Sequence, residues 1–331
     1  MNRTDYVAML DRIDSRGADT MVHWLSGART GASDVLPEDA PLPGTPARGL
    51  GQTCRVTPEG DVFVESLTGR PRLTIVGGGH VGNAFAHIAV TLGFETTVID
   101  ERPDFADPAR LPGVDHVVCG PYTDAVAALP EYANSYFVFV TPGHKSDLAC
   151  APIALRRPFQ YLGMIGSRAK IVMVRGALKE QGFTDEEIDR IHAPIGLSIG
   201  GRSPAEIAVS IAAEIIQVRA QHGNAAFDPD VADGLRGLAR TPDVPAVLAT
   251  VVGHGGSVPR GTGTRMLVID GEQRIGSIGG GKIEAASLKR IDALLQSGES
   301  FDVGDYDLSN REGAELGMTC GGRVRIMFEA L

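Results

Sequence analysis

The chain of 331 residues has an ordinary soluble composition, with 43% hydrophobic residues, 22% charged residues and a formal net charge of −10. This length suggests two domains, and the apolar fraction is enough for a sizeable buried core. The negative charge argues against binding to nucleic acid or to an anionic membrane surface. The four cysteines form no CxxC pair and no apolar run reaches 18 residues, so we expect a cytoplasmic protein with reduced thiols and no membrane segment.

Residues 1–70 begin with an amphipathic stretch and continue into a region of low hydrophobicity. Apolar side chains recur at loosely helical spacing over residues 5–27, which predicts one or two short helices. Residues 28–52 are rich in Pro, Gly and Asp, which predicts an extended loop. We interpret residues 1–70 as an N-terminal segment, partly loop, that packs with the C-terminal domain.

Residues 71–222 alternate short β-branched runs with amphipathic helical stretches. The runs are LTIV, TTVI, HVVC and SYFVFV, and each is followed by a loop and a helical pattern. This alternation is typical of a doubly wound parallel sheet, the Rossmann-like α/β fold. Capping boxes of Thr184 with Glu187 and of Ser203 with Glu206 predict two helix starts.

A GxGxxG loop, formed by Gly77, Gly79 and Gly82, follows the first apolar run and opens a helical stretch. Glycines at this spacing allow a tight turn and let the backbone approach a pyrophosphate. Asp100 ends the next strand, where an acidic side chain can bond a ribose hydroxyl. His80 lies within the loop and either bonds a phosphate or caps the turn. The pattern predicts a nucleotide site, and its alternative is a glycine-packed turn without a ligand.

Residues 223–234 resemble a linker, and residues 235–331 predict a second, smaller α/β domain with three glycine clusters. One cluster directly precedes a helical stretch, so its amides and the helix dipole would converge on one anion; its members are Gly279, Gly280 and Gly281. Arg260 and Arg265 flank another cluster and are expected to make forked contacts with phosphate. Turn-rich hairpins without a ligand are the alternative interpretation.

Cys320 precedes two glycines and stands close to Arg323. Its thiol is either partly ionised, and able to bind a soft metal or carry sulfur, or packed and inert. The stretches TCRVTPEGDVFVESL from Thr53 and TCGGRVRIMFEAL from Thr319 share a Thr-Cys start, a β-rich run and a Glu two residues before a closing Leu. This echo is either a coincidence or a sign that the N-terminal segment belongs structurally with the C-terminal domain.

Longer stretches resemble the xanthine dehydrogenase accessory protein family, XdhC/CoxI. GSVPRGTGTRMLV, GSIGGGKIEAA and CGGRVRIMFE resemble the small domain of that family, whereas IVGGGHVGNAFAHIAVTLGFETTVIDERPDFA and HAPIGLSIGGRSPAEIAVSIAAEI resemble its Rossmann domain. The resemblance covers about residues 55–331. The order of the two domains differs, because the family places the small domain first and this chain places it last.

The resemblance implies a cytoplasmic chaperone that binds molybdenum cofactor, as molybdopterin or its dinucleotide form. Such a protein protects the cofactor during sulfuration and delivers it to a molybdenum hydroxylase client, with a cysteine desulfurase as a further partner and a homodimer as the expected assembly. The Rossmann site would hold part of the cofactor, NAD(P) or another nucleotide. The cofactor-binding residues implied by the resemblance are Gly77, Gly79, His80, Gly82, Asp100, Ser257, Arg260, Gly279, Gly280, Gly281 and Cys320. No catalytic residue and no metal ligand is assigned.

Two other interpretations stay open on the sequence. An NAD(P)-dependent oxidoreductase of a small molecule would need His144 and Asp147, in TPGHKSDL, within hydrogen-bond reach of each other and facing a nicotinamide. A regulatory nucleotide sensor would need only the first glycine loop. A cofactor-insertion chaperone is favoured over a catalyst.

Overall fold

The computed structural model divides the chain into two compact units. The structure describes residues 1–36, 43–46, 54–222, 225–255, 261–307 and 322–331. The first unit comprises Met1–Ile13, Asp19–Leu67 and Ala225–Leu331, and the second comprises Asp14–Ala18 and Thr68–Asn224.

The second unit is built on a six-stranded sheet in the order β11-β10-β9-β6-β7-β8. Its strands are β6 (Arg72–Val76), β7 (Glu95–Asp100), β8 (His116–Cys119), β9 (Ser135–Phe139), β10 (Tyr161–Met164) and β11 (Ile191–His192). All neighbouring strands run parallel. The strand order reverses between β6 and β9, which is where ligands bind in doubly wound folds. The predicted Rossmann-like fold is therefore confirmed.

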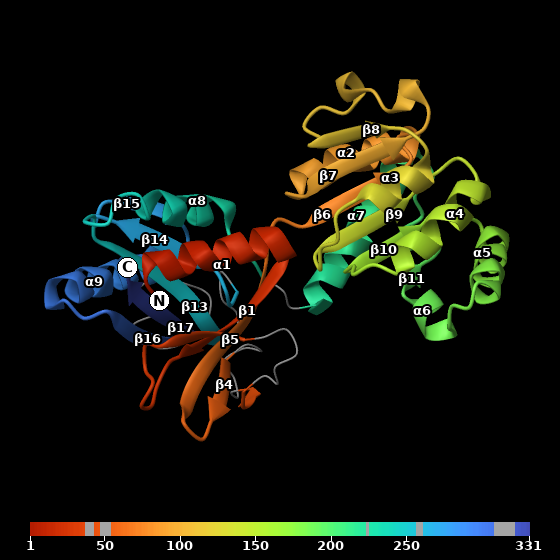
Figure 1. The fold of residues 1–331 in the computed structure, drawn as a ribbon. Coiled ribbons are helices and arrows are strands. Elements are labelled where there is room, and N and C mark those ends of the chain that lie inside the picture. Colours follow the sequence, from red (N-terminus) through yellow and green to blue (C-terminus); the bar gives the residue numbers. More distant parts are fainter. Residues whose placement is uncertain (37–42, 47–53, 223–224, 256–260, 308–321) are drawn as a thin grey trace. The chain divides into compact units, whose positions relative to one another are not determined.

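Helices cover both faces of this parallel sheet (Figure 1). They are α2 (His80–Thr91), α3 (Tyr122–Ala128), α4 (His144–Leu155), α5 (Arg168–Glu180), α6 (Asp185–Asp189) and α7 (Pro204–His222), with 3-10 turns at Pro103–Phe105 and Pro108–Arg110. Phe85 of α2 and Ile211 of α7 pack with Ile75 on one face, while α3 to α6 pack on the other. The predicted capping box of Thr184 with Glu187 is present at the start of α6.

The first unit contains two sheets. Its strands are β1 (Ala18–Trp24), β2 (Ser33–Leu36), β3 (Thr45–Pro46), β4 (Cys54–Thr57), β5 (Gly60–Thr68), β12 (Ala225–Ala226), β13 (Ala246–Gly255), β14 (Arg265–Ile269), β15 (Gln273–Gly276), β16 (Phe301–Asp307) and β17 (Arg323–Ala330). One sheet has the order β2-β1-β5-β4-β3 with β12 beside β5, and the other, wholly antiparallel, has the order β15-β14-β13-β17-β16.

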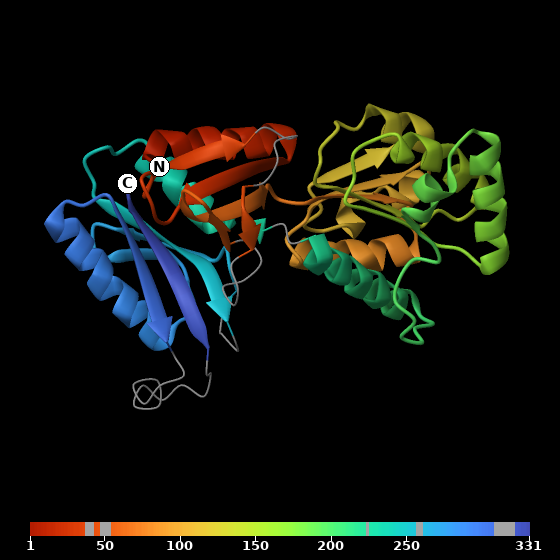
Figure 2. The same ribbon diagram turned by 90° about the horizontal axis from the view of Figure 1, so that it is seen from below.

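Three helices pack on these strands: α1 (Arg3–Arg16), α8 (Pro229–Leu238) and α9 (Gly281–Ser297). Apolar side chains of α1 and α8, including Met9 and Leu235, share one core with Leu248 of β13. Ile291 of α9 packs on the opposite face of the same sheet with Val251. Figure 2 shows α9, in blue, along that sheet. The antiparallel sheet is thus covered on both faces.

The same strand order occurs twice in this unit. The order β2-β1-β5-β4 corresponds strand for strand to β14-β13-β17-β16, and a helix precedes each set, α1 before β1 and α8 before β13. Glu65 and Glu329, the two glutamates of the sequence echo, lie on the corresponding strands β5 and β17. Helix α9, which follows the glycine cluster, belongs to the second set, and the described residues of the first set form no corresponding helix.

Local structure differs from the prediction in four places. Residues 28–52 were expected to form a loop but contain β2 and β3. The run TTVI was expected to precede a helix, but β7 is followed by two 3-10 turns. Residues 18–24 form strand β1, where a helix was expected, because Gly17 adopts a positive φ of 89° that ends α1 and the chain then extends. The predicted linker over residues 223–234 contains the start of α8. Asp228 caps that helix and Pro229 occupies its first position, a start signal that was missed.

Candidate functional site

The GxGxxG loop connects β6 to α2 at the reversal of strand order. Gly77 has a φ of 115°, and a Cβ there would lie 2.6 Å from the carbonyl oxygen of Val140, just after β9. A Cβ on Gly82 would lie 1.8 Å from the carbonyl oxygen of Gly77. These two glycines are therefore required by the turn itself, whether or not a ligand binds.

Gly79 differs from its neighbours because the space beside it is open. It caps α2 with an extended backbone, and the nearest atom to an added Cβ is Nη2 of Arg102, at 3.9 Å. His80 follows as the first residue of α2, and its side chain is exposed. The N-terminus of α2 thus combines a glycine with open space beside it, free helix amides and a nearby guanidinium. This combination suits an anionic group.

The Asp100 carboxylate lies beneath this loop and is fully buried. It accepts hydrogen bonds from the Gly78 amide at 2.8 Å and from Arg102, whose backbone N–H, Nε and Nη2 lie at 3.0, 2.9 and 2.8 Å. Burial alone would raise the pKa of Asp100, but these hydrogen bonds outweigh burial and hold the pKa below its usual value. Asp100 was expected to meet a ribose hydroxyl; here its oxygens hold the loop and Arg102.

Arg102, two residues after Asp100, reaches the surface at this strand end, as does Glu101, and the sequence interpretation missed the arginine. Its side chain is 38% exposed and its guanidinium lies over the ring of Phe105, 3.9 Å from the ring centroid. Hydrogen bonding to Asp100 raises the pKa of Arg102, so it stays charged. The signal was the arginine two residues after the acidic residue that ends the strand, since this position can serve a phosphate on the ribose in place of a hydroxyl.

The second glycine cluster opens α9 in the first unit. Gly279, Gly280 and Gly281 have φ values of 134°, 72° and 57°. The Gly280 amide donates to Oε1 of Glu284 at 3.0 Å, and the same oxygen accepts from the Ser277 hydroxyl at 2.6 Å. The chain's own carboxylate therefore occupies part of the predicted anion position, and a phosphate would have to displace Glu284.

Three of the predicted binding residues, Ser257, Arg260 and Cys320, lie outside the described residues, so their roles stay predictions. The expectation that Arg265 contacts a phosphate is wrong. Its side chain is 2% exposed and forms an ion pair with Glu65, which is 4% exposed. An arginine engaged in a buried ion pair cannot reach an external anion.

That ion pair belongs to a buried polar network in the first unit. Glu65 also binds Nε2 of His23 at 3.0 Å, and Nδ1 of His23 bonds the Ser33 hydroxyl at 2.9 Å. Glu329 accepts a hydrogen bond from Tyr6 and lies 4.0 Å from Nδ1 of His23. The two echo glutamates thus meet at one histidine. Sequence reasoning missed this network because its members come from separate strands and helices that are distant in the chain.

Asp147, one of the two residues proposed for the rival oxidoreductase, already has partners within the chain. Asp147 is fully buried, accepts a hydrogen bond from the Thr141 hydroxyl at 2.9 Å and pairs with Lys170. His144 begins α4, and its side chain is not among those described. Over the described residues, no group of three or more His, Cys, Asp or Glu side chains could hold a metal ion. Within the same ranges, no helix has the length and apolar character needed to cross a bilayer.

Similarity to known proteins agrees with this two-part architecture. Residues 73–215 match the XdhC Rossmann domain, and residues 239–307 match the XdhC and CoxI family. An Escherichia coli (strain K12) protein described as "Uncharacterized protein YqeB" is 34% identical over 159 residues, covering 48% of this chain and 29% of that protein. A Bacillus subtilis (strain 168) protein described as a probable subunit of xanthine dehydrogenase is 26% identical over 160 residues, covering 48% of this chain and 46% of that protein.

The chain therefore spans less than half the length of these two curated relatives. A crystal structure described as a xanthine dehydrogenase from Bacillus halodurans is 22% identical, with a TM-score of 0.46, and the match covers 64% of this chain and 62% of that one. The first family match falls within the parallel-sheet unit, and the second covers β13 to β16 with α9 and ends before β17. The chain belongs to the XdhC and CoxI family, with its Rossmann domain ahead of its CoxI-type domain.

Proposed function

We propose that this protein is an accessory protein for a xanthine dehydrogenase-type molybdenum hydroxylase. In this proposal the accessory protein carries molybdenum cofactor as cargo while the hydroxylase matures. Family membership supports an accessory role, as does similarity to a protein described as a probable subunit of xanthine dehydrogenase. The cargo, its sulfuration and its insertion into the client are parts of the proposal. A homodimer and a cysteine desulfurase partner belong to it as well.

We further propose that the glycine loop of the second unit binds a nucleotide, either as part of a dinucleotide form of the cofactor or as a separate ligand such as NADP. The observation that carries this step is the open space at Gly79 next to the Arg102 guanidinium. Asp100 and Phe105 fix that guanidinium from two sides, so little side-chain entropy would be lost when it binds a phosphate. The residues present thus fit a phosphorylated nucleotide.

The nucleotide step can be tested by calorimetric titration of the purified chain with NADP and with NAD. A Gly79→Ala substitution should leave folding intact, because its backbone is extended and the added methyl meets only Arg102 at 3.9 Å. The methyl group would keep the backbone from approaching a pyrophosphate, so we expect at least tenfold weaker binding. The matched control is Gly176→Ala on α5, where an added Cβ has no neighbouring atom within 4 Å. Equal affinity of both variants would contradict the placement.

The carrier step needs a separate assay. The purified chain would be incubated with molybdenum cofactor, freed of unbound cofactor by gel filtration, and added to a cofactor-free xanthine dehydrogenase. We expect retained cofactor in the mass spectrum and recovery of hydroxylase activity. Nucleotide retention alone, coupled to turnover of a small substrate without any client, would favour the oxidoreductase instead.

A further inference from the structure

One face of the parallel sheet in the second unit is only partly covered. Helix α3 has seven residues and is about 10 Å long, whereas the six residues of β7 extend over about 20 Å. Both faces of a parallel sheet are normally covered. Here a hollow of about 310 Å³ remains over the amino-terminal ends of β6 to β9. Its volume is at the lower end of the range for small-molecule sites.

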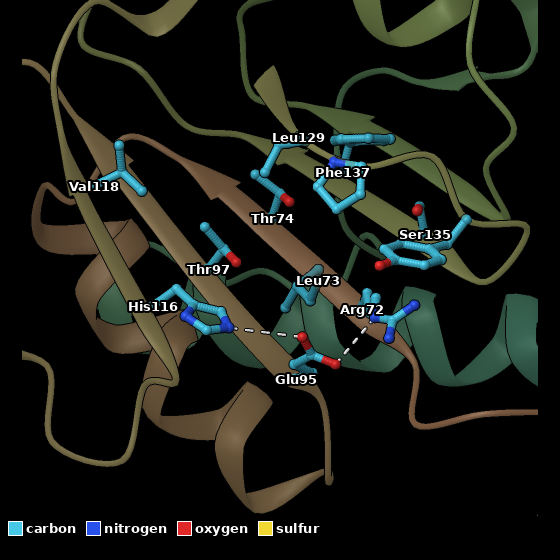
Figure 3. A pocket seen from close by; sticks show the side chains of 12 residues that line it. Arg72, Leu73, Thr74, Glu95, Thr97, His116, Val118, Leu129, Ser135 and Phe137 are labelled. Carbon is cyan, nitrogen blue, oxygen red and sulfur yellow. Dashed lines mark hydrogen bonds and ion pairs between the residues drawn. The ribbon is translucent and has the colours of Figure 1, made fainter. Parts of the chain in front are cut away.

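Three side-chain hydroxyls face this hollow, and the chain leaves them unused. They belong to Thr74 on β6, Thr97 on β7 and Ser135 on β9. Figure 3 shows Thr74 and Thr97 on the floor of the hollow, with Ser135 farther along. In the described part of the chain these hydroxyls have no hydrogen-bond partner, and they are absent from the set of enclosed polar atoms without partners. They are therefore open to a ligand or to water.

Charged side chains line one end of the hollow, but their opposite charges nearly cancel. Oε2 of Glu95 accepts a hydrogen bond from Nε of Arg72 at 3.0 Å, and the guanidinium lies over the ring of Tyr132. Oε1 of Glu95 is 3.7 Å from Nε2 of His116, too far for a hydrogen bond (Figure 3). This oxygen can accept a hydrogen bond from an N–H group of a ligand. Arg72 already neutralises the charge of the Glu95 carboxylate.

Apolar side chains flank the hydroxyls on two sides of the hollow. Phe137 lies on β9 beside Thr74, with Leu129 near it, whereas Val118 lies on the edge strand β8, beyond Thr97 (Figure 3). Val118 is 36% exposed, so this side of the hollow is open to solvent. A flat ligand between the two sides would bury apolar surface while its edge met Glu95 and the hydroxyls.

We propose that this hollow binds an uncharged, flat nitrogen heterocycle whose edge carries both N–H donors and C=O acceptors, as an oxopurine base does. The N–H groups would donate to Glu95, and the carbonyl groups would accept from Thr74 or Thr97. An anion would meet the Glu95 carboxylate and a cation would meet Arg72. A hydrocarbon would displace water from the three hydroxyls without replacing the hydrogen bonds of that water, which is costly.

This site is separate from the glycine loop. The hollow lies over the residues that begin the strands, whereas Gly77 directly follows Val76, the last residue of β6. The two sites thus lie at opposite ends of one sheet. The heterocycle site does not depend on the proposed carrier function, and either can fail without the other.

The test is a calorimetric and saturation-transfer NMR titration of the full chain with hypoxanthine, with benzoate and toluene as probes of anionic and apolar ligands. Thr97→Val should weaken hypoxanthine binding about fivefold, the effect of losing one hydrogen bond. Val118→Trp should abolish binding by filling the hollow from its β8 side, and the place of Val118 on the edge strand makes the substitution compatible with folding. The matched control is Thr91→Val, whose hydroxyl bonds the His87 carbonyl within α2 at 2.9 Å.

The result expected is hypoxanthine binding that fails in Val118→Trp, weakens in Thr97→Val and is unchanged in Thr91→Val, with NADP binding equal in all three variants. The proposal is overturned if hypoxanthine does not bind at millimolar concentration. It is overturned equally if benzoate or toluene binds as tightly as hypoxanthine, or if Val118→Trp binds hypoxanthine as the unaltered chain does.

Discussion

Replacing Arg265 with Met should destabilise the first unit by about 3 to 5 kcal/mol, the range found when one member of a buried ion pair is removed. The Arg265 and Glu65 side chains are 2% and 4% exposed, so water cannot take over the role of the lost partner. Methionine fills a similar length with apolar atoms but leaves the Glu65 carboxylate with only His23 beside it. The loss of stability therefore comes from the Glu65 carboxylate, which stays buried with too little positive charge beside it.

The pKa of Glu65 reflects the same interaction, together with burial and the hydrogen bond from His23. Burial alone would raise the pKa of Glu65, but the Arg265 charge and the hydrogen bond from His23 outweigh burial and lower the pKa from 4.5 to about 2. A change of this size corresponds to about 3 kcal/mol of stabilisation of the charged form. This figure agrees with the lower end of the range expected for the substitution.

The assay is urea denaturation followed by tryptophan fluorescence. Trp24 is the single tryptophan of the sequence and lies in the first unit, 6% exposed, so its signal reports unfolding of that unit. The control is Arg323→Met, which removes an arginine that is 74% exposed from its pair with Asp307 and should cost less than about 1 kcal/mol. A loss of about 1 kcal/mol or less in Arg265→Met would refute the reasoning.

The dependence of stability on pH provides a second readout. The pKa of Glu65 is lower in the folded chain than in the unfolded chain, so its contribution is complete above about pH 4.5 and is lost as the pH falls towards about 2. Arg265→Met brings the two pKa values closer, and the decline of stability between these pH values should become shallower. An unchanged slope would show that Arg265 does not set the pKa of Glu65.

Three further outcomes are expected in the second unit. Gly82→Ala should lower its stability by about 3 kcal/mol or more in thermal unfolding followed by circular dichroism, because the added methyl lies 1.8 Å from a backbone oxygen; an unchanged melting temperature would contradict this geometry. Thr184→Ala should cost about 1 kcal/mol in the same measurement, since it removes the hydroxyl that caps α6 and meets the Glu187 amide at 3.2 Å. In the folded chain, thiol labelling mapped by mass spectrometry should modify exposed Cys119 before Cys150, because burial raises the pKa of the Cys150 thiol to about 12. Equal labelling rates would count against the burial of Cys150.

The parallel sheet was accessible from sequence because most of its strands are followed by a helix, so the pattern is local. The glycine loop was recognised for the same reason, since Gly77 and Gly82 are required by a turn within one short stretch. The role of Asp100 was harder to predict. An acidic residue at that position can bond a ribose or an adjacent arginine, and only the folded chain shows it bonded to Arg102.

The first unit was harder to predict because its contacts join distant parts of the chain. Arg265 stands beside a glycine cluster in sequence, which suggested an anion site, yet its partner Glu65 is 200 positions away. The hydrophobic pattern of residues 18–24 did not distinguish a strand from a helix, and pairing with β2 and β5 decides the outcome. Tertiary contacts override local preference in both cases.

The repeated strand order accounts for the unusual order of the domains. The first set of strands precedes the parallel-sheet unit and the second set follows it, and both sets belong to one compact unit. The first set, which has fewer described elements, therefore occupies the position in the sequence where the family is expected to place its small domain. The second set, with α9 and its glycine cluster, comes after residue 225. Glu65 and Glu329 occupy corresponding strands and both approach His23, so the two sets stabilise each other through one buried network. If the first set contributed nothing, its removal would leave the second set folded. Removal should instead take the partner Glu65 from Arg265 and expose the apolar core that α1 shares with α8 and β13, and so unfold the second set.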